Sequence, residues 1–335
     1  RPPAHNLFPY TSCFRAVAAN ELNQVFDQDV VHAQSRLNWQ VTSKFKVQGR
    51  IAARQKTTFE DMQSPKSYMN YGDSRNGDYK MWNNGQLNFD ADVLATYSDQ
   101  FGDNFGVNVN AGASTFKRTL SNTYQSTDGL VVPFIYNLGN TQGPVRATNA
   151  NHTSITRSAY ASVNFDIFRS TYLNFSGRND WSSTLSAENN SYFYPSASFS
   201  TIVSDYIPMP RAIDYVKLYS SWASVSSALD PYSIRAVYNK ALTYGSTPSV
   251  SYPSGIINPN ILPEQSNTWE MGLAFAFLKN RRNMDVTYYD MRDRNQIIQL
   301  ENSDASGFAT RMVNGNVYRT QGVEVMLGAR IIEND

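Results

Sequence analysis

The stretch Phe105-Gly106-Val107-Asn108-Val109-Asn110-Ala111-Gly112-Ala113 alternates apolar with polar or glycine residues from end to end. Successive side chains of a β-strand point to opposite faces, so this spacing gathers the apolar side chains on one face. The opposite face then carries Asn108 and Asn110 between two glycines. The period of two therefore predicts a strand with one apolar and one polar face.

The segment before it repeats the pattern. In residues 87–97 apolar side chains again occupy every second position, opposite Asp90 and Asp92. Residues 98–104 join the two segments and contain Gly and Asp, which are common in turns. The two segments together predict an antiparallel hairpin whose polar face carries both carboxylates and both asparagines.

The same period recurs along the rest of the chain. It marks residues 31–41, 45–56, 157–167, 171–181, 193–203, 216–226, 267–278, 283–293 and 316–330. The sequence thus predicts about eleven antiparallel strands and an all-β fold. Each predicted strand is near the roughly 9–11 residues that cross a bilayer when tilted.

The connections between these strands alternate in length. The short ones are 42–44, 99–104, 168–170, 204–215 and 279–282, and the long ones are 57–84, 117–156, 182–192, 227–266 and 294–314. Outer-membrane barrels combine tight periplasmic turns with longer extracellular loops. We therefore predict a transmembrane β-barrel wall with this orientation. Residues 14–26 differ, because their apolar spacing predicts a short amphipathic helix.

Composition narrows the class of protein. The 335 residues are 41% hydrophobic with a net charge of +1, and the mean hydropathy is −0.46. No apolar run approaches the roughly 20 residues of a membrane helix, whereas a barrel strand averages lipid-facing with lumen-facing residues. The near-zero net charge gives no sign of a nucleic-acid partner.

The residues offer little for catalysis or metal binding. Cys13 is the single cysteine, and the three histidines are far apart in sequence. Glu264 and Glu270 resemble a glycosidase pair in type, but Glu270 alternates with Trp269 and Met271, as a lumen-facing polar residue would. We predict no enzyme activity, no catalytic residue, no metal and no cofactor.

Aromatic residues make up 13% of the chain and suggest two roles. Those near predicted strand ends suit bilayer interfaces, namely Trp39, Tyr97, Tyr172, Tyr219 and Trp269. Those in or beside the predicted long loops could stack on a sugar ring or a peptide side chain, or pack within the loops, namely Tyr71, Trp82, Trp181 and Tyr252. The predicted polar wall of the lumen consists of Asp90, Asp92, Asn108, Asn110 and Glu270.

Several segments carry a family resemblance. Residues 261–273, Ile-Leu-Pro-Glu-Gln-Ser-Asn-Thr-Trp-Glu-Met-Gly-Leu, resemble the SusC/RagA family of TonB-linked outer-membrane transporters. The segments 178–183, 194–197, 314–316 and 320–325 also resemble that family and occur in its order. The resemblance extends over most of the chain from about residue 31.

This resemblance implies a location and a mechanism. Members sit in the outer membrane of Gram-negative bacteria, in contact with its lipid, and have a barrel of 22 strands closed by an N-terminal plug that contacts TonB. A SusD-like surface lipoprotein delivers the substrate, which is a glycan or a peptide oligomer. We expect residues 1–335 to form part of a single barrel domain, with the plug domain and the terminal strands absent.

Two other functions are consistent with an all-β sequence. A soluble carbohydrate-binding module would bury the apolar face of residues 87–109 in a sandwich core and would have long loops at both ends. A β-rich glycosidase would need a catalytic carboxylate pair, for which Glu270 is the candidate.

Overall fold

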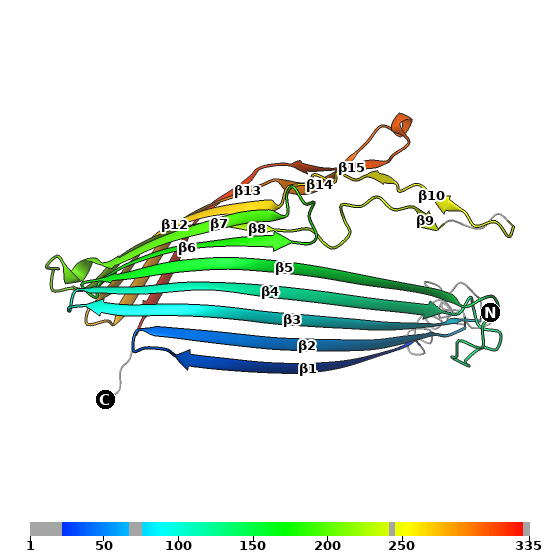
Figure 1. The fold of residues 1–335 in the computed structure, drawn as a ribbon, viewed down its shortest axis with the longest axis horizontal. Helices are drawn as coiled ribbons and strands as arrows, with labels where there is room; N and C mark the ends of the chain where they lie inside the picture. Colours follow the sequence, from blue (N-terminus) through cyan, green and yellow to red (C-terminus); the bar gives the residue numbers. More distant parts are fainter. Residues whose placement is uncertain (1–21, 67–75, 241–244, 331–335) are drawn as a thin grey trace, which may run out of the picture. The chain divides into compact units, whose positions relative to one another are not determined.

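The computed structural model describes residues 22–66, 76–240 and 245–330. Eleven of its strands form one sheet in the order β1-β2-β3-β4-β5-β6-β7-β8-β12-β13-β16 (Figure 1). Strands adjacent in the sheet therefore follow one another along the chain, apart from short strands within two long connections. The all-β class and the eleven predicted strands are confirmed.

The strands of this sheet differ in length. They are β1 (Asn23–Gln40), β2 (Phe45–Ser64), β3 (Asp78–Phe101), β4 (Phe105–Ser126), β5 (Arg146–Ile167), β6 (Thr171–Ser182), β7 (Ser191–Ile202), β8 (Ile213–Ser227), β12 (Glu264–Phe277), β13 (Arg282–Arg294) and β16 (Tyr318–Ala329). The shorter elements are β9 (Asn239–Lys240), β10 (Val250–Ser251), β11 (Gly255–Ile256), β14 (Gln296–Glu301), β15 (Thr310–Gly315) and two 3-10 turns, η1 (Val203–Asp205) and η2 (Asp304–Ser306).

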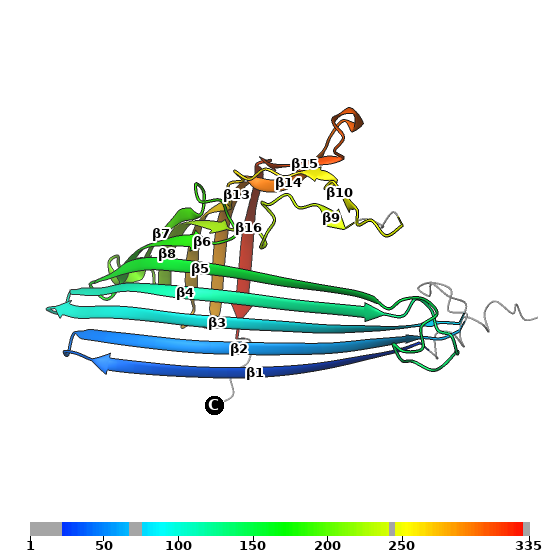
Figure 2. The same ribbon diagram turned by 45° about the vertical axis from the view of Figure 1, so that its right-hand side comes forward.

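The chain divides into two compact units. The first consists of residues 1–34, 52–89 and 117–153, and the second of residues 35–51, 90–116 and 154–335. The first unit thus holds the parts of β1 to β5 that are farther in sequence from the short turns. The second unit holds the remaining parts of these strands, all the short turns and the strands from β6 onward (Figure 2).

The register of β12 shows how the second unit separates its two faces. Trp269, Met271 and Leu273 share one face and are 41%, 42% and 37% exposed. Across β13 their partners are Asp290, Tyr288 and Val286, whereas Glu270 lies opposite Tyr289 on the other face. We call the first the apolar face and the second the polar face.

Few hydrophobic side chains are buried. Among the described residues they are Leu130, Leu185, Val216 and Ile261. The large apolar side chains of the strands are mostly exposed instead, including Leu87, Phe89 and Val93. A sandwich would bury this face against a second sheet, so the described part of the chain contradicts the sandwich alternative.

The short turns of the second unit lie next to one another at one end of the strands. Backbone hydrogen bonds join neighbouring connections: Ser98 N donates to Lys44 O at 2.9 Å, Phe168 N to Asn104 O at 2.7 Å, Ile202 N to Ser170 O at 2.8 Å and Leu278 N to Ala212 O at 3.0 Å. In the first turn Lys44 Nζ lies 2.7 Å from Asp99 Oδ1, and its hydrogen bond to Asp99 raises the pKa of Lys44. The predicted alternation of short and long connections holds except on the two sides of β7, where residues 183–190, predicted as part of a long connection, are fewer than residues 203–212, predicted as part of a short one.

The first five strands are longer than predicted. They contain 18, 20, 24, 22 and 22 residues, so much of the predicted long loops 57–84 and 117–156 is strand. At these ends both faces carry polar side chains, as in residues 146–154, so the apolar period disappears while backbone pairing continues.

The helix predicted over residues 14–26 is also corrected in part. Residues 23–26 belong to β1, and residues 14–21 lie outside the described residues. Val25 and Phe26 pair as strand because a neighbouring strand supplies hydrogen-bond partners that the local sequence does not reveal. Within the described ranges, no helix has both the length and the apolar character needed to span a membrane.

Two of the segments that carry the family resemblance meet in the long connections. The side chain of Asn314 accepts a hydrogen bond from Leu262 N at 2.9 Å and donates to Leu262 O at 2.9 Å and to Asn295 O at 2.8 Å. Next to this contact, Ile261 is fully buried. The short strands β11, β15 and β14 form a small sheet in the same region. The long connections before β12 and after β13 are therefore tied together.

An arginine placed on the apolar face should lower the free energy of unfolding more than an arginine placed on the polar face. Val325 is 58% exposed on the apolar face, opposite Val286 of β13. We expect Val325→Arg in the full-length protein to lower the free energy of unfolding by about 2–4 kcal/mol, the cost of arginine on a lipid-facing strand near mid-membrane. The measurement is urea unfolding of the protein refolded in lipid vesicles.

Met326→Arg is the matched control. Met326 is the next residue and lies on the polar face opposite Asp285. This variant should unfold within about 1 kcal/mol of the wild type, because a water-lined surface tolerates charge. Equal destabilisation by the two variants would contradict the assignment of the faces.

Candidate functional site

The polar face carries the predicted wall residues. Asp90 and Asp92 lie on β3, Asn108 and Asn110 on β4, and Glu270 on β12. The structure brings the carboxylates together with an arginine and the asparagines together with one another. Glu270 belongs to a different part of the sheet, where its neighbours are Ser221 and Tyr289.

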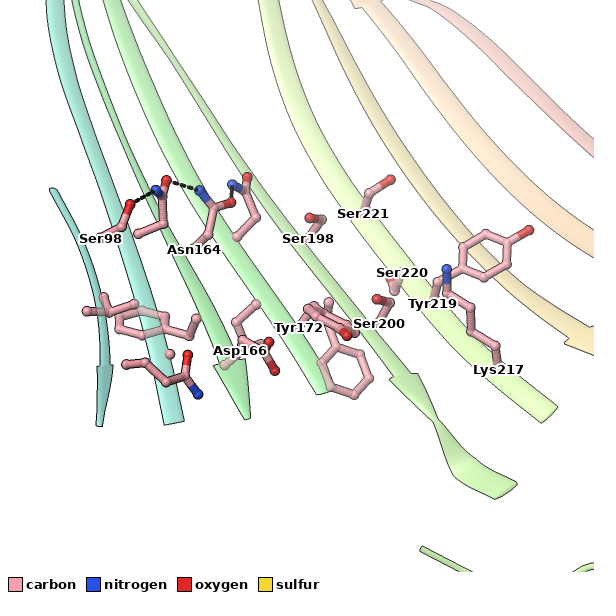
Figure 3. Close-up of a pocket in the computed structure, with 18 of the residues that line it drawn as sticks. Ser98, Asn164, Asp166, Tyr172, Ser198, Ser200, Lys217, Tyr219, Ser220 and Ser221 are labelled. Carbon is pink, nitrogen blue, oxygen red and sulfur yellow. Dashed lines mark hydrogen bonds between the residues drawn. The ribbon is translucent and has the colours of Figure 1, made fainter. Parts of the chain in front are cut away.

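Near the short turns, polar side chains form a hydrogen-bonded row across β3, β4, β5 and β6. A serine of β3 stands at one end, and the other members are asparagines. Asn108 Nδ2 donates to Ser98 Oγ at 2.6 Å, and Asn110 Nδ2 donates to Asn108 Oδ1 at 2.8 Å. Asn164 Nδ2 reaches Asn108 Oδ1 at 3.4 Å, and Asn174 donates to Asn164. We call these five residues the amide ladder, of which Figure 3 labels Ser98 and Asn164.

The amide ladder borders a hollow of about 840 Å³ that continues over β7, β8 and β13. On this side Tyr219 donates its hydroxyl proton to Asp285 Oδ1 at 2.7 Å, and the hydroxyl oxygen lies 2.6 Å from Thr287 Oγ1. Lys217 Nζ lies 5.8 Å from the centre of the Tyr219 ring. The hollow thus offers amides, hydroxyls, a cation and a carboxylate.

One glycine explains how Tyr219 lies flat on the wall. A Cβ added to Gly272 would lie 2.3 Å from Cζ of Tyr219, which is far closer than any packed contact. The tyrosine ring therefore occupies the space that any other side chain at position 272 would need. This accounts for the glycine in the family-like run Glu270-Met271-Gly272.

Farther from the short turns, the polar face changes from amides to charges. Arg50 on β2 bridges two carboxylates of β3: its Nε lies 2.5 Å from Asp92 Oδ1 and its Nη2 lies 3.5 Å from Asp90 Oδ1. The side chain of Asp92 is only 9% exposed to water, so the contact with Arg50 supplies much of the stabilisation of the Asp92 carboxylate. Tyr160 and Arg178 complete a hollow of about 470 Å³ beside this bridge.

A second ion pair continues this charged zone on β6. Arg178 Nε donates to Asp180 Oδ1 at 2.7 Å, and Tyr194 OH on β7 donates to Asp180 Oδ2 at 2.5 Å. The Arg178 guanidinium also lies 5.8 Å from the centre of the Tyr160 ring. We call Arg50, Asp90, Asp92, Tyr160, Arg178, Asp180 and Tyr194 the charged zone. Such groups can hydrogen-bond hydroxyls or amides of a passing solute without breaking a covalent bond.

Most residues of the charged zone were not predicted from the sequence. Arg50, Tyr160 and Arg178 stand at the same alternating positions as the predicted wall residues. Alternation therefore could have placed them on the polar face. Their pairing could not be read, because Arg50 and Asp92 are 42 positions apart.

The predicted loop aromatics do not form one site. Tyr71 lies outside the described residues. Trp82 lies within β3 instead of a loop, and its ring centre is 5.2 Å from that of Tyr124. Trp181 lies within β6 on the apolar face, at the alternating positions of Phe175. Trp82 is in a strand because β3 begins before the predicted strand of residues 87–97, whereas Trp181 stands at the end of the predicted strand 171–181, beside the connection of residues 183–190.

Tyr252 keeps the exposure expected of a loop aromatic. It follows β10 directly and is 72% exposed. Its ring centre lies 5.1 Å from that of Tyr238, edge to face. This tyrosine pair is therefore the candidate contact for a solute within the connection between β8 and β12.

Glu264 and Glu270 are too far apart for the glycosidase alternative. Glu264 and Glu270 both belong to β12, six residues apart. A strand rises about 3.3 Å per residue, so their backbones are about 20 Å apart. Paired glycosidase carboxylates lie within about 9.5 Å. Glu264 instead accepts a hydrogen bond from Ile297 N at 2.9 Å.

The described residues contain no group of three or more His, Cys, Asp or Glu that could hold a metal ion.

The chain is similar to known proteins along most of its length. A family model described as "TonB dependent receptor-like, beta-barrel" matches residues 6–331. TonB-dependent receptor P26 of Formosa agariphila is 22% identical over 267 residues, which cover 76% of this chain and 26% of that protein. TonB-dependent receptor P3 of the same organism is 22% identical over 275 residues, which cover 80% of this chain and 26% of that protein. The chain thus spans about a quarter of the length of these relatives.

Solved structures share the fold. The RagAB peptide transporter superposes with a TM-score of 0.82 at 16% identity, covering 94% of this chain and 36% of that chain. The RagAB peptide importer in its "open-open" state gives 0.79 at 17% identity, with 94% and 35% covered. The siderophore receptor PiuA from Acinetobacter baumannii gives 0.57 at 16% identity, with 92% and 45% covered.

The bridge through Arg50 predicts a specific double-mutant result. Arg50→Ala leaves Asp90 and Asp92 on one face without their shared guanidinium. We expect the free energy of unfolding of the full-length protein to fall by about 1–3 kcal/mol, because a poorly exposed carboxylate loses its partner. Urea unfolding in lipid vesicles measures the change.

Asp92→Asn combined with Arg50→Ala should recover at least half of that loss, since it removes the charge left behind. Two outcomes would contradict the bridge: an unchanged stability in Arg50→Ala, or losses that simply add in the double variant.

Proposed function

This chain belongs to the TonB-dependent receptor β-barrel family, and from that premise we propose that the protein imports a glycan or peptide oligomer through energy supplied by TonB. The family is one of outer-membrane proteins, so the eleven-stranded sheet lies in the outer membrane. The exposed apolar face then contacts lipid, and the polar face lines the route of the solute.

The observation that carries the proposal is the composition of the polar face. Along the strands of the second unit it passes from the charged zone to the amide ladder, and both consist of groups that hydrogen-bond hydroxyls and amides. Sugars and peptides present those same partners. Charges within the zone are largely paired with one another, which supports passage better than tight retention of an ion.

The proposed partners follow from the architecture. A SusD-like lipoprotein would sit over the long connections, which the small sheet of β11, β15 and β14 holds together. TonB would act through a plug inside the barrel. The RagAB peptide transporter shares this fold, which is consistent with a peptide as the solute but does not select peptide over glycan.

We assign residues 1–335 to one barrel domain. β1 and β16 stand at the two ends of the sheet order. In a bilayer each unpaired edge would be costly, so further strands of the same barrel would pair with them. A barrel of 22 strands would accommodate this sheet as half of its wall.

The test uses the full-length gene in its own bacterium. We expect the product in outer-membrane fractions as a band whose mobility changes on heating. Growth on at least one glycan or peptide oligomer as sole nutrient should be lost on deleting this gene and equally on deleting tonB. A soluble periplasmic product, or uptake that persists without TonB, would overturn the proposal.

The exposed tyrosine pair predicts a change in substrate affinity. Tyr252→Ala removes the 72%-exposed ring that packs against Tyr238. Stacking by one aromatic contributes about 0.5–1.5 kcal/mol, so we expect oligomer affinity to fall roughly 2- to 10-fold. Trp181→Ala, on the apolar face, is the control and should leave affinity unchanged. Equal affinities of the wild type and Tyr252→Ala would remove Tyr252 from the substrate site.

A further inference from the structure

Three arginines gather at one end of the apolar face. Arg292 and Arg294 lie on β13, and Arg319 lies on β16 directly opposite Arg292. Alternation along β13 places both of its arginines on the face of Val286. β13 begins at the short turn of residues 278–281, so this end of the strand adjoins the long connections. We call these three residues and Asp290 the arginine cluster.

The charge of the arginine cluster is not balanced within it. Arg319 forms a two-pronged pair with Asp290, through Nε at 3.1 Å and Nη2 at 2.6 Å. Arg292 Nε lies 3.6 Å from the same carboxylate. Asp290 thus contacts two of the three guanidinium groups, and the four residues together carry a net charge of +2. The side chains of Arg292 and Arg319 are 45% and 49% exposed.

A hollow of about 420 Å³ opens beside these side chains. Its walls include Arg292, Arg294 and Asp290, together with the amides of Gln265 and Asn267 on β12. Trp222 and Trp269 form its remaining wall. The hollow thus combines cations, hydrogen-bond donors and indole rings on a face that is otherwise apolar.

The residues follow an order along the strands that matches the layers of a membrane. Next to the arginine cluster lie Trp269 and Tyr288, whose ring centres are 6.0 Å apart. Both have polar anchors: Trp269 Nε1 donates to Ser220 Oγ at 3.1 Å, and Tyr288 OH accepts from Gln321 Nε2 at 2.6 Å. The next positions on this face are Met271 and Leu273 of β12 and Val286 of β13, which are aliphatic. Aliphatic residues suit the hydrocarbon layer, Trp and Tyr its boundary, and arginine the headgroups.

We propose that the arginine cluster binds the phosphate-bearing headgroup of a lipid in the outer leaflet. The inference rests on the proposed function for its orientation, with the long connections outside the cell. Guanidinium groups bind phosphate through paired hydrogen bonds. The face points away from the polar wall, so its ligand comes from the surrounding membrane and not from the imported solute. Gln265 and Asn267 would contact further polar groups of the headgroup.

The test measures lipid retention by the full-length protein with native mass spectrometry. The probes are diphosphorylated lipid A, phosphatidylcholine and inorganic phosphate. We expect retention of lipid A alone, because the choline cation of phosphatidylcholine balances the charge of its phosphate. The variant Arg292→Ala/Arg294→Ala keeps the Arg319–Asp290 pair, so no carboxylate loses its closest partner. Its affinity for lipid A should fall at least tenfold.

Lys279→Ala/Arg282→Ala is the matched control. It removes two cations from the opposite end of the same hairpin. Its affinity for lipid A should stay within twofold of the wild type. Equal lipid A affinity in the wild type and Arg292→Ala/Arg294→Ala would overturn the proposal. Binding of inorganic phosphate that needs Arg292 and Arg294 and equals lipid A binding would also overturn it, because free phosphate would then be the ligand.

Failure of this proposal is distinguishable from failure of the proposed function. Heat-modifiable assembly in the outer membrane and TonB-dependent uptake report on the barrel itself. Both should be retained in Arg292→Ala/Arg294→Ala, because neither arginine lies on the polar face.

Discussion

Backbone hydrogen bonding between neighbouring strands is the constraint on which the rest of this structure depends. Lipid offers no partner to a peptide group, so a chain that crosses it with strands must pair each one with its neighbour. The eleven strands meet this requirement in a single sheet that follows chain order. A sheet without a second layer cannot hide its apolar side chains, so they gather on one exposed face. Polar side chains then occupy the opposite face, so one face of each strand is apolar and the other is polar.

That division explains the character of the polar face. Its charges occur as bridges such as Arg50 with Asp90 and Asp92, and its amides bond one another across β4, β5 and β6. Groups held in this way line a passage without collapsing into it. The same division explains why the arginine cluster stands out, because it places three guanidinium groups on the apolar face beside one carboxylate, Asp290, which pairs with Arg292 and Arg319. The proposed solute route and the proposed lipid contact thus belong to opposite faces of the same strands.

The sequence predicted the number of strands because period two is a local property, clear in runs such as residues 105–113. It did not predict the lengths of β1 to β5, because strand ends such as residues 146–154 are polar on both faces. Trp82 was expected in or beside a loop for the same reason. Contacts such as Arg50 with Asp92 were beyond reach, since they depend on the register between strands. The family resemblance did identify Asn314 and Gly272, although their roles became clear only from the structure.

The central claim is that β12 has lipid on one side and a water-lined wall on the other. Spin labels placed singly at residues 269 to 277, except Gly272, of the full-length protein in lipid vesicles test it directly. The account predicts collision with oxygen, which dissolves in lipid, at the odd positions, and collision with a water-soluble nickel chelate at the even positions. A uniform profile along the strand, or water access at Met271 and Leu273, would contradict it.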